Sequence, residues 1–220
     1  KLQVDLIFQP TKSRRKKILL ADMDCTMIQQ ECIDELADQA GLGVVVRDIT
    51  ARAMNGELDF EDALHERIAL LKGQPATIID QVLAERIDLM PGGKLLVATM
   101  QSHGAYTALV SGGLTAFSSV IAAELGFNEH HANQLLIKDG LLTGKVVPPI
   151  LGKQAKVDAL DAITSRLGLS DSDVLAVGDG ANDLGMLERA GTGVALHAKP
   201  SVAAQSDVHV NFGDLTAFLF

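Results

Sequence analysis

Four aspartates lie in two short motifs with the character of a metal-assisted chemical site. Asp22 and Asp24 come directly after an apolar run, while Asp179 and Asp183 lie in a glycine-containing segment after another apolar run. Side chains two positions apart on an extended segment point the same way. The first two carboxylates therefore repel each other unless a proton or a cation compensates them. Two aspartates alone are also typical of a polar turn, but four at two strand ends favour a hard cation such as Mg²⁺, which prefers oxygen ligands.

Two further segments have the chemistry of an anion site. Ser111-Gly112-Gly113 stands between an apolar run and a helical pattern, and a hydroxyl with free N–H groups at a helix N-terminus binds anions. Taken in isolation, the same residues suit a plain N-cap with a glycine turn better. Lys156 falls in the first turn of a predicted helix, where a cation opposes the helix dipole. From the residues alone, Lys156 is either an anion ligand or a solvated side chain.

The elements that must position these motifs alternate between apolar runs and helical patterns. This order predicts an α/β fold with an open, doubly wound (Rossmann-like) parallel sheet, which binds ligands beyond the carboxyl ends of its strands. A β-hairpin is expected over 133–147, with its turn at 138–140. The expected strands are 18–21, 105–110, 173–177, 193–196 and 208–210, and the expected helices are 92–103, 114–125, 153–167 and 182–190.

One long segment interrupts this alternation. Residues 30–88 contain only helical patterns, at 31–40, 45–54, 60–71 and 77–87, which predicts an all-helical insertion after the first strand. We therefore divide the chain into a linker or remnant of an upstream region (1–17), a catalytic core (18–29 and 89–220) and a helical cap (30–88). Hinges are expected near 28–30 and 88–91.

Composition excludes several classes of protein. The 220 residues include 19 basic and 28 acidic ones, a net charge of −9, which argues against sequence-independent nucleic-acid binding. Five basic residues within 12–17 are expected to form a solvated linker. The longest stretch without Asp, Glu, Lys or Arg, 95–123, is broken by polar side chains, so no membrane span is expected. Two cysteines seven positions apart predict reduced thiols in a cytoplasmic protein, and the six histidines show no metal-ligand spacing.

The motifs resemble, in order, the four motifs of the haloacid dehalogenase-like phosphatases. The resemblance covers about residues 18–213, and the helical insertion corresponds to a cap in the first position. Within that superfamily, residues 22–36 and 54–73 look like the phosphoserine phosphatase family, through Glu31, Met54, Phe60 and the stretch 67–73. Cys25 stands where family members often carry Ser. The motifs are Asp22-Met23-Asp24-Cys25-Thr26, Ser111-Gly112, Lys156 and Gly178-Asp179-Gly180-Ala181-Asn182-Asp183.

The resemblance implies a catalytic role for each acid of the first motif. Asp22 would attack phosphorus and form an aspartyl-phosphate. Asp24 would protonate the departing oxygen and later take a proton from the hydrolytic water. Asp22, the main-chain carbonyl of Asp24, and Asp179 would hold Mg²⁺, which neutralises the nucleophile against the phosphate dianion.

The resemblance also assigns the phosphate-binding residues. Ser111, the N–H of Gly112, and Lys156 would bind the remaining phosphoryl oxygens, over which charge is spread in the transition state. Asp183 would orient Lys156 or a metal-bound water. Asn182 would act at the phosphate or at the edge of the substrate.

Substrate choice is assigned to the cap. For phosphoserine, the expected small-molecule partner, Glu31 would bind the ammonium and Arg67 the carboxylate, with Met54 and Phe60 as the apolar wall. The function implied is the last step of serine biosynthesis. The alternatives are a phosphatase for phosphoethanolamine or a small sugar phosphate, a phospho-accepting receiver-like signalling module, and a catalytically inactive binding protein. No nucleic-acid or membrane partner is expected, and a homodimer is left open.

Overall fold

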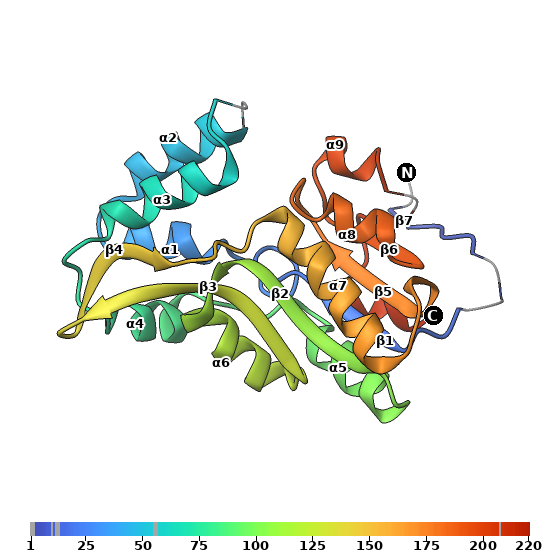
Figure 1. The fold of residues 1–220 in the computed structure, drawn as a ribbon. Coiled ribbons are helices and arrows are strands. Elements are labelled where there is room, and N and C mark those ends of the chain that lie inside the picture. The colour runs from blue at the N-terminus through green and yellow to red at the C-terminus, as the bar shows by residue number, and fades with distance from the viewer. Residues whose placement is uncertain (1–2, 10, 12–13, 55–56, 207) are drawn as a thin grey trace.

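A mostly parallel β-sheet forms the centre of the molecule. The computed structural model describes residues 3–9, 11, 14–54, 57–206 and 208–220 (Figure 1). Their seven-stranded sheet has the order β4-β3-β2-β1-β5-β6-β7, and each neighbouring pair of these strands is parallel except β3 and β4. The predicted α/β class is confirmed. The strands are β1 (Ile18–Ala21), β2 (Tyr106–Leu114), β3 (Glu129–Lys138), β4 (Leu141–Val147), β5 (Val174–Gly178), β6 (Thr192–Leu196) and β7 (Val208–Val210).

Helices cover both faces of the sheet, so strand residues on both faces are apolar. In β1, Leu19 belongs to a cluster with α5 and α6, whereas Ile18 and Leu20 belong to a second cluster with α7 and α8. The core helices are α5 (Gly93–Ser102), α6 (Thr115–Leu125), α7 (Lys153–Leu167), α8 (Leu184–Arg189) and α9 (Pro200–Ala203), with 3₁₀ helices η1 (Asp171–Asp173) and η2 (Leu215–Leu219).

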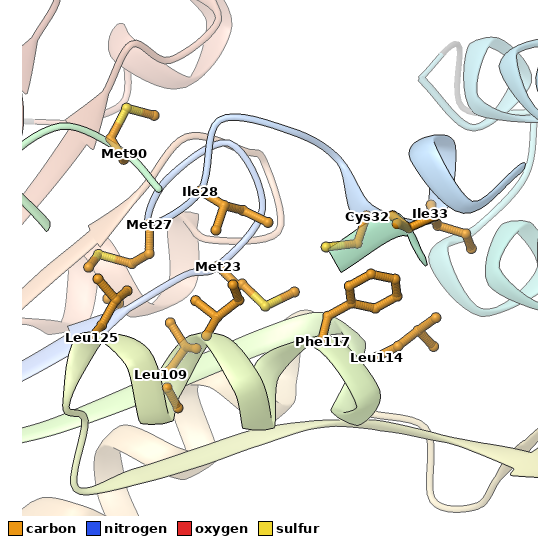
Figure 2. Close-up of a cluster of buried hydrophobic side chains, with 14 of the residues drawn as sticks. Met23, Met27, Ile28, Cys32, Ile33, Met90, Leu109, Leu114, Phe117 and Leu125 are labelled. Atoms are coloured by element: carbon orange, nitrogen blue, oxygen red, sulfur yellow. The ribbon is translucent and has the colours of Figure 1, made fainter. Parts of the chain in front are cut away.

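The described residues between β1 and α5, where the sequence predicts a helical insertion, form four helices. They are α1 (Cys32–Gln39), α2 (Gly43–Met54), α3 (Phe60–Leu70) and α4 (Ile78–Glu85). One apolar cluster runs from the core into these helices, and Figure 2 shows Phe117 of α6 beside Cys32 and Ile33 of α1. The insertion is therefore packed on the core and is not an independent body.

The insertion joins the core through two paired linkers. Ile28 and Leu89 form an isolated antiparallel bridge. The side chain of Gln30 donates to Asp88 Oδ2 (3.0 Å) and accepts from the Asp88 N–H (2.9 Å). These are the segments in which the sequence predicts hinges.

A third attachment was not predicted. The loop between α3 and α4 pairs with β4: the Gly73 N–H donates to the Leu142 carbonyl (2.8 Å), and the Leu142 N–H donates to the Gln74 carbonyl (2.9 Å). Figure 1 shows the long β3–β4 hairpin reaching into the insertion, below α3 and above α4 in this view. This contact joins segments far apart in the chain, so local patterns could not indicate it.

Two predicted boundaries near the motifs differ from the structure. The turn expected at Ser111-Gly112-Gly113 is wrong, because β2 continues to Leu114 and its pairing with β3 is irregular between Val110 and Leu114. The Gly113 N–H bonds to Ser111 Oγ (2.8 Å) within this irregular stretch, as in a β-bulge that re-aims a side chain. Helix α8 begins at Leu184, so Asn182 lies in the preceding turn.

In the described part of the N-terminal segment, Asp5 is tied to the segment after β7. The Asp5 carboxylate accepts hydrogen bonds from the N–H groups of Asn211, Phe212 and Gly213 at 2.9–3.0 Å. Among the described residues, none of the helices is both long enough and apolar enough to span a bilayer.

Candidate active site

A lysine ammonium between two carboxylates forms the centre of the site. Lys156, in the first turn of α7, places Nζ 2.6 Å from Asp22 Oδ1 and in contact with Asp183 Oδ1. Lys156 is only 1% exposed and Asp183 is 0% exposed. Burial by itself lowers the pKa of Lys156, but Asp183 and Asp22 outweigh burial and raise it. The lysine is therefore a permanent cation at the carboxyl ends of β1 and β5.

Asp183 also closes the turn that follows β5. Its Oδ2 accepts hydrogen bonds from the N–H groups of Asp179 (3.1 Å) and Gly180 (2.9 Å). A Cβ on Gly178 would lie 2.4 Å from Asp183 Cγ, so a larger residue there would displace the carboxylate. This packing explains the first glycine of the motif.

Asp24 is buried beside this group but makes different contacts. Its Oδ1 accepts from the Cys32 N–H (2.9 Å), and its Oδ2 accepts from Ser111 Oγ (3.3 Å). Burial raises the pKa of Asp24, against the lowering effect of the hydrogen bonds from Cys32 and Ser111. A carboxyl with a raised pKa can carry a proton and give it up, as a general acid must.

Three carboxylates converge where a cation could bind. Asp22, Asp179 and Asp183 each offer an oxygen, and these atoms lie within 4.8 Å of one another. Burial, followed by the charge of Asp183, raises the pKa of Asp22 and raises that of Asp179 to about 6. One lysine does not balance three acids, and the donors are hard oxygens, so the set fits a divalent cation. The sequence pattern grouped Asp183 with the other three aspartates around a cation, whereas the family resemblance assigned Asp22 and Asp179 to the metal and gave Asp183 an orienting role.

Polar groups from three segments line the side of the site nearest β2. Ser111 Oγ lies between Asp24 and the Gly113 N–H. A Cβ on Gly112 would lie 2.8 Å from Cζ of Phe60, so the aromatic ring of α3 lies directly over this glycine. The Asn182 amide is half-buried above the Gly180 backbone.

Asn133 is a positioning residue that the sequence analysis missed. Its side chain donates to the carbonyls of Gly112 (2.8 Å) and Leu151 (3.1 Å) and accepts from the Leu151 N–H (2.7 Å). It is 1% exposed, and it ties the end of β2 to the loop before α7. A buried amide must find such partners, and an Asn within a β-prone run was the available signal.

Thr26 was quoted in the first motif without a role. The structure buries it, and its hydroxyl donates to Asp179 Oδ1 (3.3 Å). This bond connects the two acidic motifs across the sheet edge.

The insertion brings one basic and one acidic side chain, an arginine and a glutamate, toward the site. Arg67 of α3 and Glu31, the N-cap residue of α1, approach to 4.0 Å between NH1 and Oε1. The arginine side chain is 11% exposed and that of the glutamate 42%. Burial and the nearby Asp24 raise the pKa of Glu31, while Arg67 lowers it. The structure thus places Glu31, Arg67 and Phe60 near the acids; the Met54 side chain lies outside the part of the chain that is described.

Comparisons with known proteins agree with this architecture. The haloacid dehalogenase-like hydrolase family matches residues 19–188. A phosphoserine phosphatase of Haemophilus influenzae is 45% identical over 97% of this chain and 68% of its own length. One of Streptococcus thermophilus is 45% identical over 93% of this chain and 94% of its own length. A solved structure described as a phospho-aspartyl intermediate analogue of phosphoserine phosphatase has a TM-score of 0.86 at 37% identity, covering 93% of this chain and 98% of that one.

The chain therefore belongs to the haloacid dehalogenase-like hydrolase family. The chain spans only 50–60% of the length of four other phosphoserine phosphatases, so these relatives are longer than this chain.

Proposed function

We propose that this chain hydrolyses O-phospho-L-serine to L-serine and phosphate, the last step of serine biosynthesis. The observation that carries the proposal is the buried Asp22–Lys156–Asp183 group with Asp24 beside it and the Glu31–Arg67 pair facing it. The phosphoserine phosphatases that resemble the chain over most of its length support it. A cytoplasmic location is part of the proposal, and two free cysteines support it.

Mg²⁺ is the proposed metal. Asp22, Asp179 and the main-chain carbonyl of Asp24 would hold it, with the Asp183 carboxylate also within reach. When bound, the ion would offset the negative charges of the nucleophile and the phosphate dianion.

In the first half-reaction, a carboxylate oxygen of Asp22 bonds to phosphorus while the bond from phosphorus to the serine oxygen breaks. Asp24, as the carboxylic acid, donates its proton to that leaving oxygen. In the second half-reaction, the Asp24 carboxylate takes a proton from water as the water oxygen attacks phosphorus, and Asp22 is released. Burial of Asp24 favours the protonated form that the first step needs.

The other phosphoryl oxygens need donors. Lys156 supplies an ammonium oriented by Asp183, while Ser111 and the Gly112 N–H supply hydrogen bonds from the end of β2. Asn182 lies on the turn opposite and would reach the phosphate or the edge of the substrate. These groups stabilise charge that is spread over the oxygens in the transition state.

Phosphoserine carries an ammonium and a carboxylate that match the Glu31–Arg67 pair. Glu31 would bind the ammonium and Arg67 the carboxylate, with Phe60 and Met54 as the apolar wall. Residues 30–88 would act as a cap that closes through hinges at 28–30 and 88–91. The pairing of residues 73–76 with β4 and its turn implies that the β3–β4 hairpin moves with the cap or serves as its pivot.

A substrate panel tests the proposal. Phosphate release is measured with L-phosphoserine, phosphoethanolamine and a small sugar phosphate, each with Mg²⁺ and with a chelator. We expect phosphoserine to have the highest kcat/KM and the chelator to abolish turnover. A higher kcat/KM for phosphoethanolamine would show that the site does not recognise the carboxylate of phosphoserine. Phosphoethanolamine would then replace phosphoserine as the proposed substrate. A phosphoprotein that persists instead of turning over would indicate a signalling module.

A further inference from the structure

A cavity of about 460 Å³ lies at the amino-terminal ends of the strands, whereas the acids of the candidate active site follow the carboxyl ends. Leu175, Thr192 and Val208 line it, and they stand at the amino-terminal starts of β5, β6 and β7. The end of α5, the helix η2 and the N-terminal segment complete its wall. Asp179 follows the carboxyl end of β5, so this cavity is separate from the active site.

The charge around the cavity is one-sided. Arg14, Arg15 and Lys16 line it, and none of the described residues that line it is acidic. This contrasts with a net charge of −9 for the chain. Neither guanidinium has a hydrogen-bond or ion-pair partner within the described part of the chain, whereas Lys16 Nζ donates to the Ser172 carbonyl (2.8 Å). The two arginines are therefore uncommitted donors at the rim.

Part of the cavity wall is apolar. Leu175, Val194 and Val208 of the sheet line it together with Met100 of α5 and Leu219 of η2. Its volume falls within the range of small-molecule sites, which combine apolar walls with a few polar groups that fix orientation. A ligand that suits both features has one anionic group and an apolar body.

We propose that this cavity binds a small amphipathic organic anion, a carboxylate, sulfonate or phosphate ester, with its charged group at Arg14 and Arg15 and its apolar part against β5, β6 and β7. The site does not depend on the phosphatase function. It also gives a specific role to the basic segment before β1, which the sequence analysis treated as a solvated linker.

Two probes that share an aromatic body test the site. Binding of 8-anilinonaphthalene-1-sulfonate and of its uncharged analogue N-phenyl-1-naphthylamine is followed by fluorescence, with the native chain and with R14Q/R15Q. We expect saturable one-site binding of the sulfonate that the variant weakens by about tenfold or more, because charge pairing to both arginines is lost. The uncharged analogue is expected to change less than about twofold.

Matched variants separate this site from general electrostatics. K138Q/K145Q removes the same charge from exposed positions of the β3–β4 hairpin and is expected to leave sulfonate binding unchanged. Thr99→Trp fills the cavity from α5 and is expected to remove binding of both probes. Equal weakening of the sulfonate by the two double variants, or the absence of saturable binding to the native chain, would overturn the proposal. Thermal unfolding checks that R14Q/R15Q is folded, and its phosphatase activity is expected to be unchanged.

Discussion

The proposed catalytic group and the proposed recognition pair are built in opposite ways. Lys156 is fully buried and contacts both of its acids directly. Arg67 and Glu31 approach only to 4.0 Å, and the glutamate side chain is 42% exposed. The groups proposed to react are therefore already in contact without substrate, whereas those proposed to recognise it retain freedom to part and bind it. Preorganised charges accelerate the chemistry of any substrate, while the loose pair discriminates among substrates.

The supporting elements explain this difference. Asp22 follows β1, whose last residue, Ala21, pairs in parallel register with Val177 of β5 and Leu109 of β2. Backbone hydrogen bonds thus fix the distances among the acidic motifs. Glu31 and Arg67 lie on separate helices of an insertion that meets the core at three attachments and one apolar cluster (Figures 1 and 2). Small movements of those helices change the recognition pair without disturbing the reacting group.

The largest effect is expected at the nucleophile. Asp22→Asn keeps the shape of the side chain but removes the attacking carboxylate, so kcat should fall by about 10⁴-fold or more on every phosphomonoester. Phosphate release and trapping of the acyl-phosphate measure this loss. Asp80→Asn, on an exposed position of α4, is the control. Robust turnover by the Asp22 variant would remove Asp22 as the nucleophile.

A smaller but selective loss is expected in the cap. Arg67→Ala removes the group proposed to bind the substrate carboxylate, which should lower kcat/KM for phosphoserine by about 30-fold or more, since such truncations cost about 2–5 kcal/mol. A generic aryl phosphate has no such carboxylate, so its turnover should change little. The ratio of the two kcat/KM values is the measurement.

Arg52→Ala provides the matched control for the cap. It also removes an arginine from the insertion, one that pairs with Glu66 at 3.0 Å and is 39% exposed, and it should leave the substrate ratio unchanged. If Arg67→Ala lowers turnover of both substrates equally, the division between a chemical region and a recognition region is wrong.

The same division explains what could be predicted from sequence. The acids of the first and last motifs follow apolar runs, so strand geometry alone brings Asp22 and Asp179 to one sheet edge. Asn133 and the pairing of Gly73 with Leu142 escaped prediction because both join segments far apart in the chain. Asp183 was placed beside Lys156, but its membership of the acidic cluster depends on how the turn after β5 closes. Roles set by strand direction or implied by the family resemblance were accessible, whereas these two contacts between separate segments were not.

Removal of the metal should affect the acidic cluster in a pH-dependent way. The pKa of Asp179 is raised from 3.8 to about 6, so the folded, metal-free protein keeps a proton that the unfolded chain has released. As the pH rises between these two pKa values, the contribution of Asp179 to the free energy of unfolding is therefore lost. Mg²⁺ requires the deprotonated form and should restore stability mainly above pH 6.

Thermal unfolding with Mg²⁺ and with a chelator, at about pH 5 and about pH 7.5, measures this effect. The difference in Tm between the two conditions should be larger at the higher pH by about 2–4 °C, the shift expected for about 1 kcal/mol in a chain of this size. A difference that is equal at both pH values would place the cation away from Asp179.

The smallest effect is expected at the linkers that join the two regions. Gln30→Ala removes the two hydrogen bonds to Asp88, which lie at the surface and together contribute about 1 kcal/mol or less. Gln154→Ala, which removes an exposed bond to Asp158 on α7, is the matched control for stability. Because Gln30 lies at a proposed cap hinge, its variant should also raise KM for phosphoserine by about twofold to fivefold, while kcat on an aryl phosphate stays the same. A change in aryl phosphate kcat as large as the change in phosphoserine KM would mean that the linker positions the catalytic acids themselves, and the two regions would then be one mechanical unit.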